Sequence, residues 1–257
     1  MIILFTSNNP ASANIAEKLI RNHGFIKNGK NEWEHGGVRL IDTNAPTVLD
    51  VPCDFDTDCI IVLSTHRSKT AGRMLTAHVP GNWGKAEMGG EPYTLNVAPA
   101  SVLKNIVTAL KKEADGIGWP VSLEADHHGP TGKVPIMFVE IGSSESEWGD
   151  GSAAEAVARA VVAAIENKKS YETVFGVGGG HYSKRFTQLV FESEIAIGHM
   201  APKYVLDGLD EKMFRQAVEK TVEPVKKVII LKDETSRKQR DKIEAFARDS
   251  DLQCESI

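Results

Sequence analysis

Short apolar runs recur along the chain, and most are followed by a polar or glycine-rich turn and an amphipathic helix. Their length and composition are typical of buried strands. The runs cover residues 2–5, 59–63, 121–123, 136–141, 173–177, 195–197 and 228–231. Strands that alternate with helices predict a mixed, mainly parallel sheet covered on both faces. The expected fold is therefore α/β, with three layers in the order α/β/α.

Local signals place helices between these strands. Asn9 can cap a helix that has Pro10 at its first position and ends at Gly24. Ser152 and Glu155 have the spacing of a capping box and precede an apolar stripe at helical spacing. Helices at these positions support the alternation of strand and helix that the apolar runs suggest.

One stretch, residues 66–98, has little periodicity. A long insertion without regular structure in a compact domain is usually functional. The chain contains no internal repeat and no low-complexity linker. We therefore expect a single domain over residues 1–257 that carries this insertion.

Composition narrows the class of protein. Hydrophobic residues make up 41% and charged residues 25% of the chain, which is ordinary for a soluble globular protein. No apolar run approaches the roughly 20 residues that span a membrane, and the first residues lack the basic start of a signal peptide. The expected location is the cytoplasm. The three cysteines form no CxxC pair, so any metal must be held by histidines and carboxylates.

The net charge is −5, but the charge is unevenly distributed. Residues 226–242 contain seven lysines and arginines against three acidic residues, which gives this segment a charge of +4. Such a run favours a solvated helix face beside a strand. The alternative is an edge that contacts nucleic-acid phosphates.

The histidines follow the predicted strands. Six of the eight lie after strands or in the insertion, namely His66, His78, His127, His128, His181 and His199. Ligands of open α/β sheets bind beyond the carboxyl ends of the strands. A single loop histidine is more often a surface or hydrogen-bonding residue. Histidines nevertheless follow four separate strands, and this pattern favours one cleft that they share.

The segment Glu124–His128 contains two carboxylates and two imidazoles in five residues. These groups are the ligand set of a catalytic zinc site without cysteine. The alternative is a polar loop with hydrogen-bonded acids. Glu140 lies inside the apolar run 136–141, where a carboxylate is costly unless it is paired or bound to metal. Glu140 could also point outward on an exposed face.

Two further segments could contact anions. Gly176–Ser183 matches neither a phosphate-binding Walker loop nor a dinucleotide-binding fingerprint. Its glycines could let backbone N–H groups approach an oxyanion, or could simply serve a tight turn with positive φ. Ser64–Lys69 contains Ser, His and Arg but no nucleophile elbow, so Arg67 and Lys69 are better suited to phosphate.

Six segments run in the same order as in one known family: Ser64–Ser68, Leu75–Gly84, Glu124–Thr131, Glu140–Glu145, Gly178–Tyr182 and Ile197–His199. Together they resemble the archaeal/plant-type D-aminoacyl-tRNA deacylases. The resemblance implies hydrolysis of the ester between a D-amino acid and the 3′-terminal adenosine of tRNA. It also implies two zinc ions per chain and a phosphorylase/hydrolase-like fold.

Ester hydrolysis needs an activated water and a stabilised oxyanion, and bound zinc supplies both. The candidate zinc ligands are His127, His128, Glu124, Asp126 and His199, with His181 as an alternative to His199. The candidate catalytic residues are Glu140, His66, His78 and His181. Glu140 would act as general base or as the partner of a ligand. His66 and His78 would either bind a second ion or donate a proton to the leaving ribose oxygen. The candidate contacts to the tRNA acceptor end are Arg67, Lys69, Lys184 and Arg185.

Two other functions fit the same residues. One is a zinc-dependent hydrolase of a small peptide or acylated amino acid, which a basic segment 226–242 far from the cleft would favour. The other is a non-enzymatic phosphate-binding module, in which the six histidines would not converge. We expect no DNA or membrane partner, and the sequence leaves a monomer and a homodimer equally open.

Overall fold

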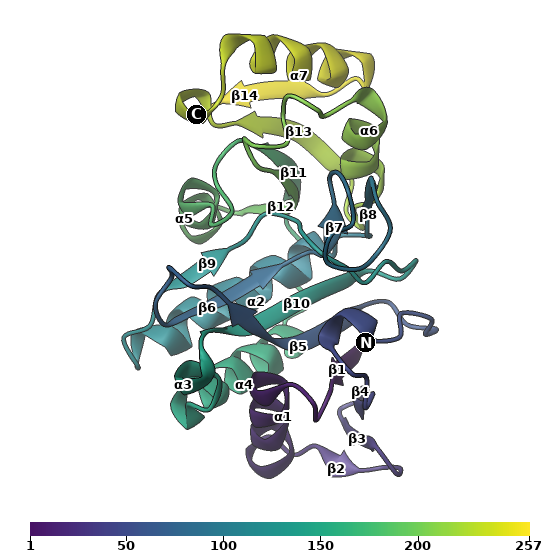
Figure 1. The fold of residues 1–257 in the computed structure, drawn as a ribbon, viewed down its shortest axis with the longest axis vertical. Helices are drawn as coiled ribbons and strands as arrows, with labels where there is room; N and C mark the ends of the chain where they lie inside the picture. Colours follow the sequence, from purple (N-terminus) through teal and green to yellow (C-terminus); the bar gives the residue numbers. More distant parts are fainter.

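Two sheets lie one beyond the other along the long axis of the molecule in the computed structural model, which describes residues 1–257 (Figure 1). The first sheet has eight strands in the order β2-β3-β4-β1-β5-β10-β6-β9. These strands are β1 (Ile2–Phe5), β2 (Ile26–Lys27), β3 (Glu32–His35), β4 (Val38–Asp42), β5 (Ile60–Arg67), β6 (Met74–His78), β9 (Val121–Leu123) and β10 (Ile136–Ser143). The pairings from β4 through β1 and β5 to β10 are parallel, whereas β6 runs antiparallel to β10.

The second sheet has four strands, all parallel, in the order β12-β11-β13-β14. They are β11 (Glu172–Val177), β12 (Ile195–Ala201), β13 (Val225–Ile230) and β14 (Gln253–Ser256). A small hairpin of β7 (Gly81–Asn82) and β8 (Thr94–Leu95) completes the strands. The expected α/β class with a mixed, mainly parallel arrangement is confirmed, although its strands are divided between two sheets.

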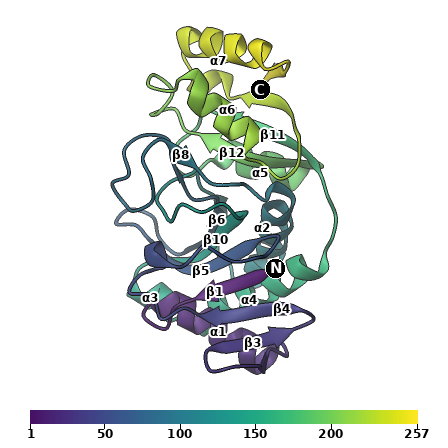
Figure 2. The same cartoon turned by 90° about the vertical axis from the view of Figure 1, so that its right-hand side faces the viewer.

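Helices cover both faces of the second sheet and one face of the first (Figures 1 and 2). The helices are α1 (Pro10–Asn22), α2 (Ala100–Asp115), α3 (Glu145–Trp148), α4 (Gly151–Glu166), α5 (Lys184–Glu192), α6 (Glu211–Glu219) and α7 (Arg237–Asp249), with short 3-10 helices η1 (Val48–Asp50) and η2 (Lys232–Glu234). Helices α1, α2 and α4 pack together against the first sheet. Its other face is covered by the segment around η1, where Ala45 and Val51 are buried against β1, β5 and β10.

One cluster of 44 buried residues joins the two sheets. It contains Leu75 and Met137 from the first sheet together with Ile197 and Ile229 from the second. A separate cluster of 15 residues fills the space between the second sheet, α6 and α7. Burial of apolar area in a common core fixes the second sheet on the first, and this positions the loop after β11.

The insertion at residues 66–98 is not without regular structure. Met74–His78 forms β6, whose five residues are all buried between β10 and β9. The run Met74-Leu75-Thr76-Ala77-His78 is interrupted by polar Thr76 and ends at His78, so the apolar pattern missed it. Because β6 pairs with β10, which carries Glu140, and with β9, which precedes Glu124, it brings His78 to the same place.

The helix starts follow the local signals in part. The side chain of Asn9 accepts a hydrogen bond from the Ser12 N–H, as expected for a cap. At α4 the cap is Asp150, which accepts from the N–H groups of Ser152 and Ala153. Glu155 contacts His23 instead of closing a capping box. No helix has the length and apolar character needed to cross a membrane.

Candidate functional site

Five of the six histidines expected to converge do so. His66 comes from the end of β5, His78 from the end of β6, His127 and His128 from the loop after β9, and His181 from the loop after β11. With Glu124 and Glu140 they form three overlapping groups, and within each group the potential ligand atoms lie within 4.8 Å of one another. The hypothesis of a non-enzymatic phosphate-binding module predicts that the histidines do not converge, so this convergence argues against it.

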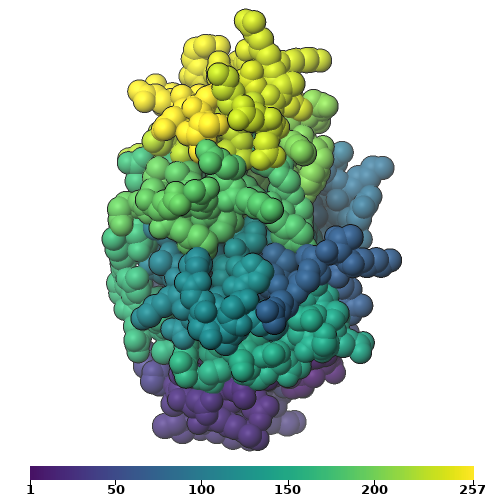
Figure 3. Space-filling view, turned by 90° about the vertical axis from the view of Figure 1, so that its left-hand side faces the viewer, coloured from purple at the N-terminus to yellow at the C-terminus, as the bar shows by residue number.

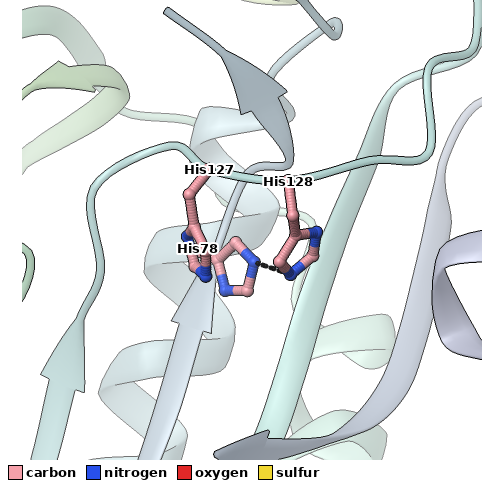
Figure 4. Close-up of side chains that lie close together, drawn as sticks. All are labelled: His78, His127 and His128. Atoms are coloured by element: carbon pink, nitrogen blue, oxygen red, sulfur yellow. Dashed lines mark hydrogen bonds between the residues drawn. The ribbon is translucent and has the colours of Figure 1, made fainter. Parts of the chain in front are cut away.

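The first group contains only imidazoles: His78, His127 and His128 (Figure 4). The Nε2 atoms of His78 and His128 are 3.1 Å apart. His127 faces the Ala125 carbonyl oxygen with Nδ1 at 2.9 Å, and His128 Nδ1 contacts the Gly129 carbonyl oxygen. A carbonyl can only accept, so both Nδ1 atoms carry the proton and both Nε2 atoms carry a lone pair.

Burial keeps these three imidazoles neutral. Desolvation, reinforced by neighbouring imidazoles, lowers the pKa of His127 to about 3. Burial lowers the pKa of His128 to about 4, even though its hydrogen bond to Gly129 opposes the change. The fully buried His78 has a pKa well below its usual value, for the same reason as His127. Neutral imidazoles with lone pairs in a common space are the form that binds metal.

Glu124 is the centre of the other two groups. Its Oε2 lies 2.8 Å from His181 Nε2 and 3.7 Å from His127 Nε2, and its Oε1 lies 3.2 Å from His66 Nδ1. The carboxylate is fully buried, and neither oxygen has a well-formed hydrogen bond. Burial raises the pKa of Glu124, but His181 and His66 outweigh burial and hold it well below its usual value. A buried anion whose oxygens lack hydrogen bonds fits a cation ligand.

Glu140 and Tyr182 lie on opposite sides of His66. Glu140 Oε2 is 3.4 Å from His66 Nδ1, and the Tyr182 hydroxyl is 2.6 Å from His66 Nε2. Burial lowers the pKa of His66, but Glu124 and Glu140 outweigh it and raise the pKa to about 11. Burial raises the pKa of Glu140 to about 7. Of the two alternatives for Glu140, the one in which it points outward on an exposed face is excluded, because its carboxylate is buried beside His66.

A cavity of about 490 Å³ opens in front of these residues. Its histidine and carboxylate lining consists of His66, His127, His128, His181 and Glu140, and its remaining lining comes from α1, η1, β5, α3 and the insertion. The volume is within the range of small-molecule sites. The insertion contributes His78 to the imidazole group and Met88 to the cavity lining.

Asp126 and His199 lie outside the three groups. His199 Nδ1 contacts Asp126 Oδ2, and His199 Nε2 donates to the Lys220 carbonyl oxygen at 2.9 Å. Asp126 Oδ1 accepts from the Met200 N–H at 2.9 Å. Both ring nitrogens of His199 therefore face acceptors, and the pair ties the loop after β9 to β12. No nitrogen of His199 remains for an ion.

The glycine-rich turn positions His181 by its backbone conformation. Gly178 and Gly179 have φ values of 109° and 84°, which disfavour any side chain. A Cβ on Gly179 would lie 2.9 Å from Ser183 Oγ. The Ala125 N–H donates to the His181 carbonyl oxygen at 2.8 Å, which joins this turn to the segment that carries Glu124.

Of the four cations expected to contact phosphate, Arg67 alone lines the cavity. Its guanidinium lies 4.7 Å from the ring of Trp148, whose Nε1 donates to the His66 carbonyl oxygen at 2.9 Å. Lys69 is exposed beyond the end of β5, and Lys184 and Arg185 are exposed at the start of α5. The contact of Trp148 with Arg67 could not be predicted from the sequence, because a lone tryptophan after a polar segment has no characteristic spacing.

The basic segment 226–242 does not line the cavity. It forms β13, η2 and the first part of α7, in the end of the molecule opposite the N-terminal strands (Figure 3). Lys227 pairs with Glu255, and Lys242 donates to the carbonyl oxygens of Leu206 and Leu209. These contacts fit the interpretation of the segment as a strand beside a solvated helix face.

Comparison with known proteins gives a consistent result. A family model described as D-aminoacyl-tRNA deacylase matches residues 53–255. The chain is 34% identical over 243 residues to the D-aminoacyl-tRNA deacylase of Pyrococcus furiosus, with 89% of each chain covered. It is 43% identical over 169 residues to that of Ignicoccus hospitalis, covering 65% of this chain and 67% of the relative. The crystal structure of the conserved protein of unknown function AF0625 superimposes with a TM-score of 0.91 at 27% identity, covering 99% of this chain and 94% of that one.

Proposed function

The chain belongs to the D-aminoacyl-tRNA deacylase family and hydrolyses the ester of D-aminoacyl-tRNA, and we propose that two zinc ions held by its histidine and glutamate groups support this reaction. The observation that carries the proposal is the buried Glu124 carboxylate, whose oxygens lack hydrogen bonds amid three imidazoles. Cytoplasmic action follows from the substrate, because aminoacyl-tRNA is consumed there in translation.

Two of the three groups share no residue, and we take these two as the ligand sets. His78, His127 and His128 form one set, and His66, Glu124 and Glu140 form the other, while the third group joins them through His127 and Glu124. A catalytic zinc ion takes three protein ligands and keeps one position open. Six donors in two such sets therefore support two ions. The absence of cysteine from both sets is consistent with zinc held by imidazole and carboxylate.

Zinc bound at these sets would supply an activated water and would polarise the ester carbonyl. The chain itself orients the donors. The Ala125 and Gly129 carbonyls hold His127 and His128 with Nε2 directed into the site. The Tyr182 hydroxyl can accept from His66 Nε2, which directs Nδ1 toward Glu124 and Glu140. Burial of Glu124 and His78 keeps bulk water away from both sets.

His181 is the remaining imidazole of the site and the most accessible one. Its side chain is 33% exposed, whereas those of His127 and His66 are 24% and 5% exposed. It lines the cavity and contacts Glu124 through Nε2. We assign to His181 the transfer of a proton to the ribose oxygen that leaves when the ester bond breaks.

The acceptor end of the tRNA would enter on the side of Arg67. Stacking on Trp148 holds the guanidinium at the cavity rim, where it can contact a phosphate. Lys69, Lys184 and Arg185 would contact phosphates farther along the strand. Each of these side chains is exposed, so a phosphate can reach it.

The test is an incubation of purified protein with D-tyrosyl-tRNA and L-tyrosyl-tRNA, with and without a chelator, followed by addition of zinc. We expect loss of the D-ester alone, abolished by the chelator and restored by zinc. Cleavage of the D-ester that resists chelation and occurs in metal-free protein would contradict the zinc proposal. If zinc-loaded protein cleaves neither ester, a small acylated amino acid becomes the substrate to test.

A further inference from the structure

The cavity in front of the proposed zinc sets has two chemically different walls. One wall carries the imidazoles and Glu140. The apolar lining residues Pro10 and Trp148 belong to α1 and α3, and four others, Pro46, Val48, Leu49 and Met88, come from the η1 segment and the insertion. Nothing in the hydrolytic chemistry requires these four residues. An apolar wall beside a reactive polar one is typical of a subsite that selects part of a substrate.

Two separate segments build the apolar wall. Thr47 caps η1, because its Oγ1 accepts from the Leu49 N–H at 3.1 Å and donates to Asp50 Oδ2 at 2.9 Å. From the insertion, the Met88 carbonyl oxygen accepts from the Gly129 N–H at 3.0 Å. That hydrogen bond places Met88 directly beside the loop that carries His128. Met88 is 58% exposed, so a bound molecule can reach its side chain.

The two segments meet at the cavity. A Cβ built on Gly89 would lie 3.5 Å from the Cβ of Leu49, so the backbone after Met88 touches η1. Gly89 and Gly90 both have φ of 75°, which fixes a turn at this contact. The wall is therefore continuous from η1 to Met88.

The charge of the cavity decides which part of the substrate lies on this wall. Arg67 is the only lysine or arginine of the lining, and it lies with Trp148 at the end of β5. The nucleotide part of an aminoacyl-tRNA carries phosphate, so it belongs at Arg67. With the ester at the imidazoles and the nucleotide at Arg67, the apolar wall faces the amino-acid part.

We propose that Val48, Leu49 and Met88 form the subsite that holds the side chain of the D-amino acid. The inference rests on the proposed function, because it requires the ester to lie at the proposed zinc sets. Methionine has an unbranched, flexible side chain that adapts to differently shaped partners. An exposed Met88 therefore accommodates apolar side chains of several sizes and gains most from the large ones.

The test compares D-tyrosyl-tRNA with D-alanyl-tRNA in the variants Met88→Ala and Leu49→Ala. We expect kcat/KM for D-tyrosyl-tRNA to fall about tenfold in each variant, because truncation removes apolar contacts to the ring. For D-alanyl-tRNA we expect a change of less than about twofold, because its methyl group reaches little of the wall. Equal losses for both substrates, or no loss for either, would overturn the inference.

D-Alanyl-tRNA also serves as the internal control for folding and metal content. The matched external control is Tyr93→Ala, because Tyr93 lies in the same insertion, is 53% exposed and does not line the cavity. We expect no change in either substrate for this variant. If wild-type protein loaded with zinc cleaves no D-aminoacyl-tRNA, the proposed function fails. If the wild type is active but the variants keep its substrate ratio, only the subsite fails.

A positive charge placed at residue 88 gives an independent test, because it should increase activity toward an acidic substrate. In Met88→Lys the cation would lie on the proposed subsite, where it would attract an acidic side chain. We expect the ratio of kcat/KM for D-aspartyl-tRNA to that for D-tyrosyl-tRNA to rise at least about tenfold. A uniform rise for all substrates would show that the new lysine contacts the tRNA instead, which would contradict the inference.

Discussion

The Nε2 atoms of His78 and His128 face each other at 3.1 Å in a buried part of the site. The Nδ1 proton of His128 is directed to the Gly129 carbonyl, so its Nε2 presents a lone pair. The Nδ1 atom of His78 is buried without a hydrogen-bond partner, whichever of its two nitrogens carries the proton. Two ligand nitrogens on one tetrahedral zinc ion lie about 3.3 Å apart, since each Zn–N bond is about 2.0–2.1 Å long. The separation thus fits two ligands of one cation.

The first prediction concerns the number of ions. In His128→Asn and in His78→Gln we expect the zinc content to fall from two ions per chain to one, because one ligand set loses a donor. Deacylation of D-tyrosyl-tRNA should fall at least about 100-fold. Elemental analysis of the dialysed protein measures the first effect. His23→Asn is the matched control, because His23 contacts Glu155 away from the cavity. Retention of both ions in either site variant would contradict the assignment.

Glu140→Gln separates two roles for this carboxylate. As a member of the set with His66 and Glu124, it is expected to hold the second ion. The variant should therefore bind one zinc ion instead of two, with the loss confined to the second set. If it keeps two ions and loses about 100-fold or more in kcat, Glu140 instead accepts a proton in the reaction. Zinc content and kcat measured on the same preparation decide between the two.

The metal-free protein should have an unusual dependence of stability on pH. Three imidazoles, His78, His127 and His128, remain neutral in the folded state because burial lowers their pKa values, whereas in the unfolded chain they take up protons near pH 6.5. Glu140 acts in the opposite sense, because burial raises its pKa to about 7 and it keeps its proton on folding. Between pH 4.5 and 6.5 the unfolded chain thus binds a net excess of two protons from these four residues.

The free energy of unfolding should therefore rise with pH over this interval, by up to about 3 kcal/mol per pH unit. Above pH 7 it should fall, because folded His66 keeps its proton up to about pH 11 while unfolded His66 loses it near 6.5. Urea unfolding of chelator-treated protein at pH 5, 6, 7 and 8 measures the curve. In His127→Asn the unfolded chain would bind one excess proton fewer, so the slope of the free energy of unfolding against pH should fall by about 1.4 kcal/mol per pH unit. A stability that is flat or falling between pH 5 and 6.5 would contradict these pKa shifts.

The sequence was sufficient for the parts of the site that are adjacent in the chain. Glu124, His127 and His128 could be grouped because they lie within five residues after an apolar strand. His78 was a candidate ligand, but its grouping with His127 and His128 could not be predicted, because it depends on the pairing of β6 with β10 and β9 over a distance in the chain. Pairing of that kind is decided by the whole core and leaves no mark on the local pattern.

His181 and His199 illustrate the same limit. Each follows an apolar strand and at least one glycine, so the two have the same local pattern. The strand before His181 ends at Val177, and the glycine turn then directs the histidine into the site. The strand before His199 continues to Ala201, so His199 stays inside β12. Where the strand ends depends on its pairing with β11, and the sequence contains no local signal for it.

The next prediction concerns Asp126 and His199. The buried Asp126 carboxylate faces Nδ1 of the buried His199, and the Lys220 carbonyl oxygen faces its Nε2. Asp126→Asn would break this buried pair, which should lower the free energy of unfolding by about 3–5 kcal/mol. The variant should still bind two zinc ions at low temperature. Loss of an ion without loss of stability would instead make Asp126 a ligand, as the sequence suggested.

The last prediction concerns Arg67 and the ionic contacts of the tRNA. Arg67 carries no ion pair with an acidic side chain, and its guanidinium is held over the Trp148 ring at the cavity rim. Removal of the charge in Arg67→Ala should raise KM for D-tyrosyl-tRNA and leave kcat within about twofold, since a phosphate contact is made equally in the ground state and the transition state.

A phosphate contact also has a signature that a merely structural arginine lacks. Each contact to a single strand contributes about 0.7 to the slope of the logarithm of binding against the logarithm of salt concentration. The slope of log KM against the logarithm of salt concentration should therefore decrease by about 0.7 in Arg67→Ala. In Arg67→Lys, which retains the charge, the slope should equal that of the wild type. Lys238→Ala is the matched control, because Lys238 is exposed on α7 outside the cavity. If Arg67→Ala keeps the wild-type slope while Lys238→Ala reduces it, the tRNA enters over α7 and not past Trp148.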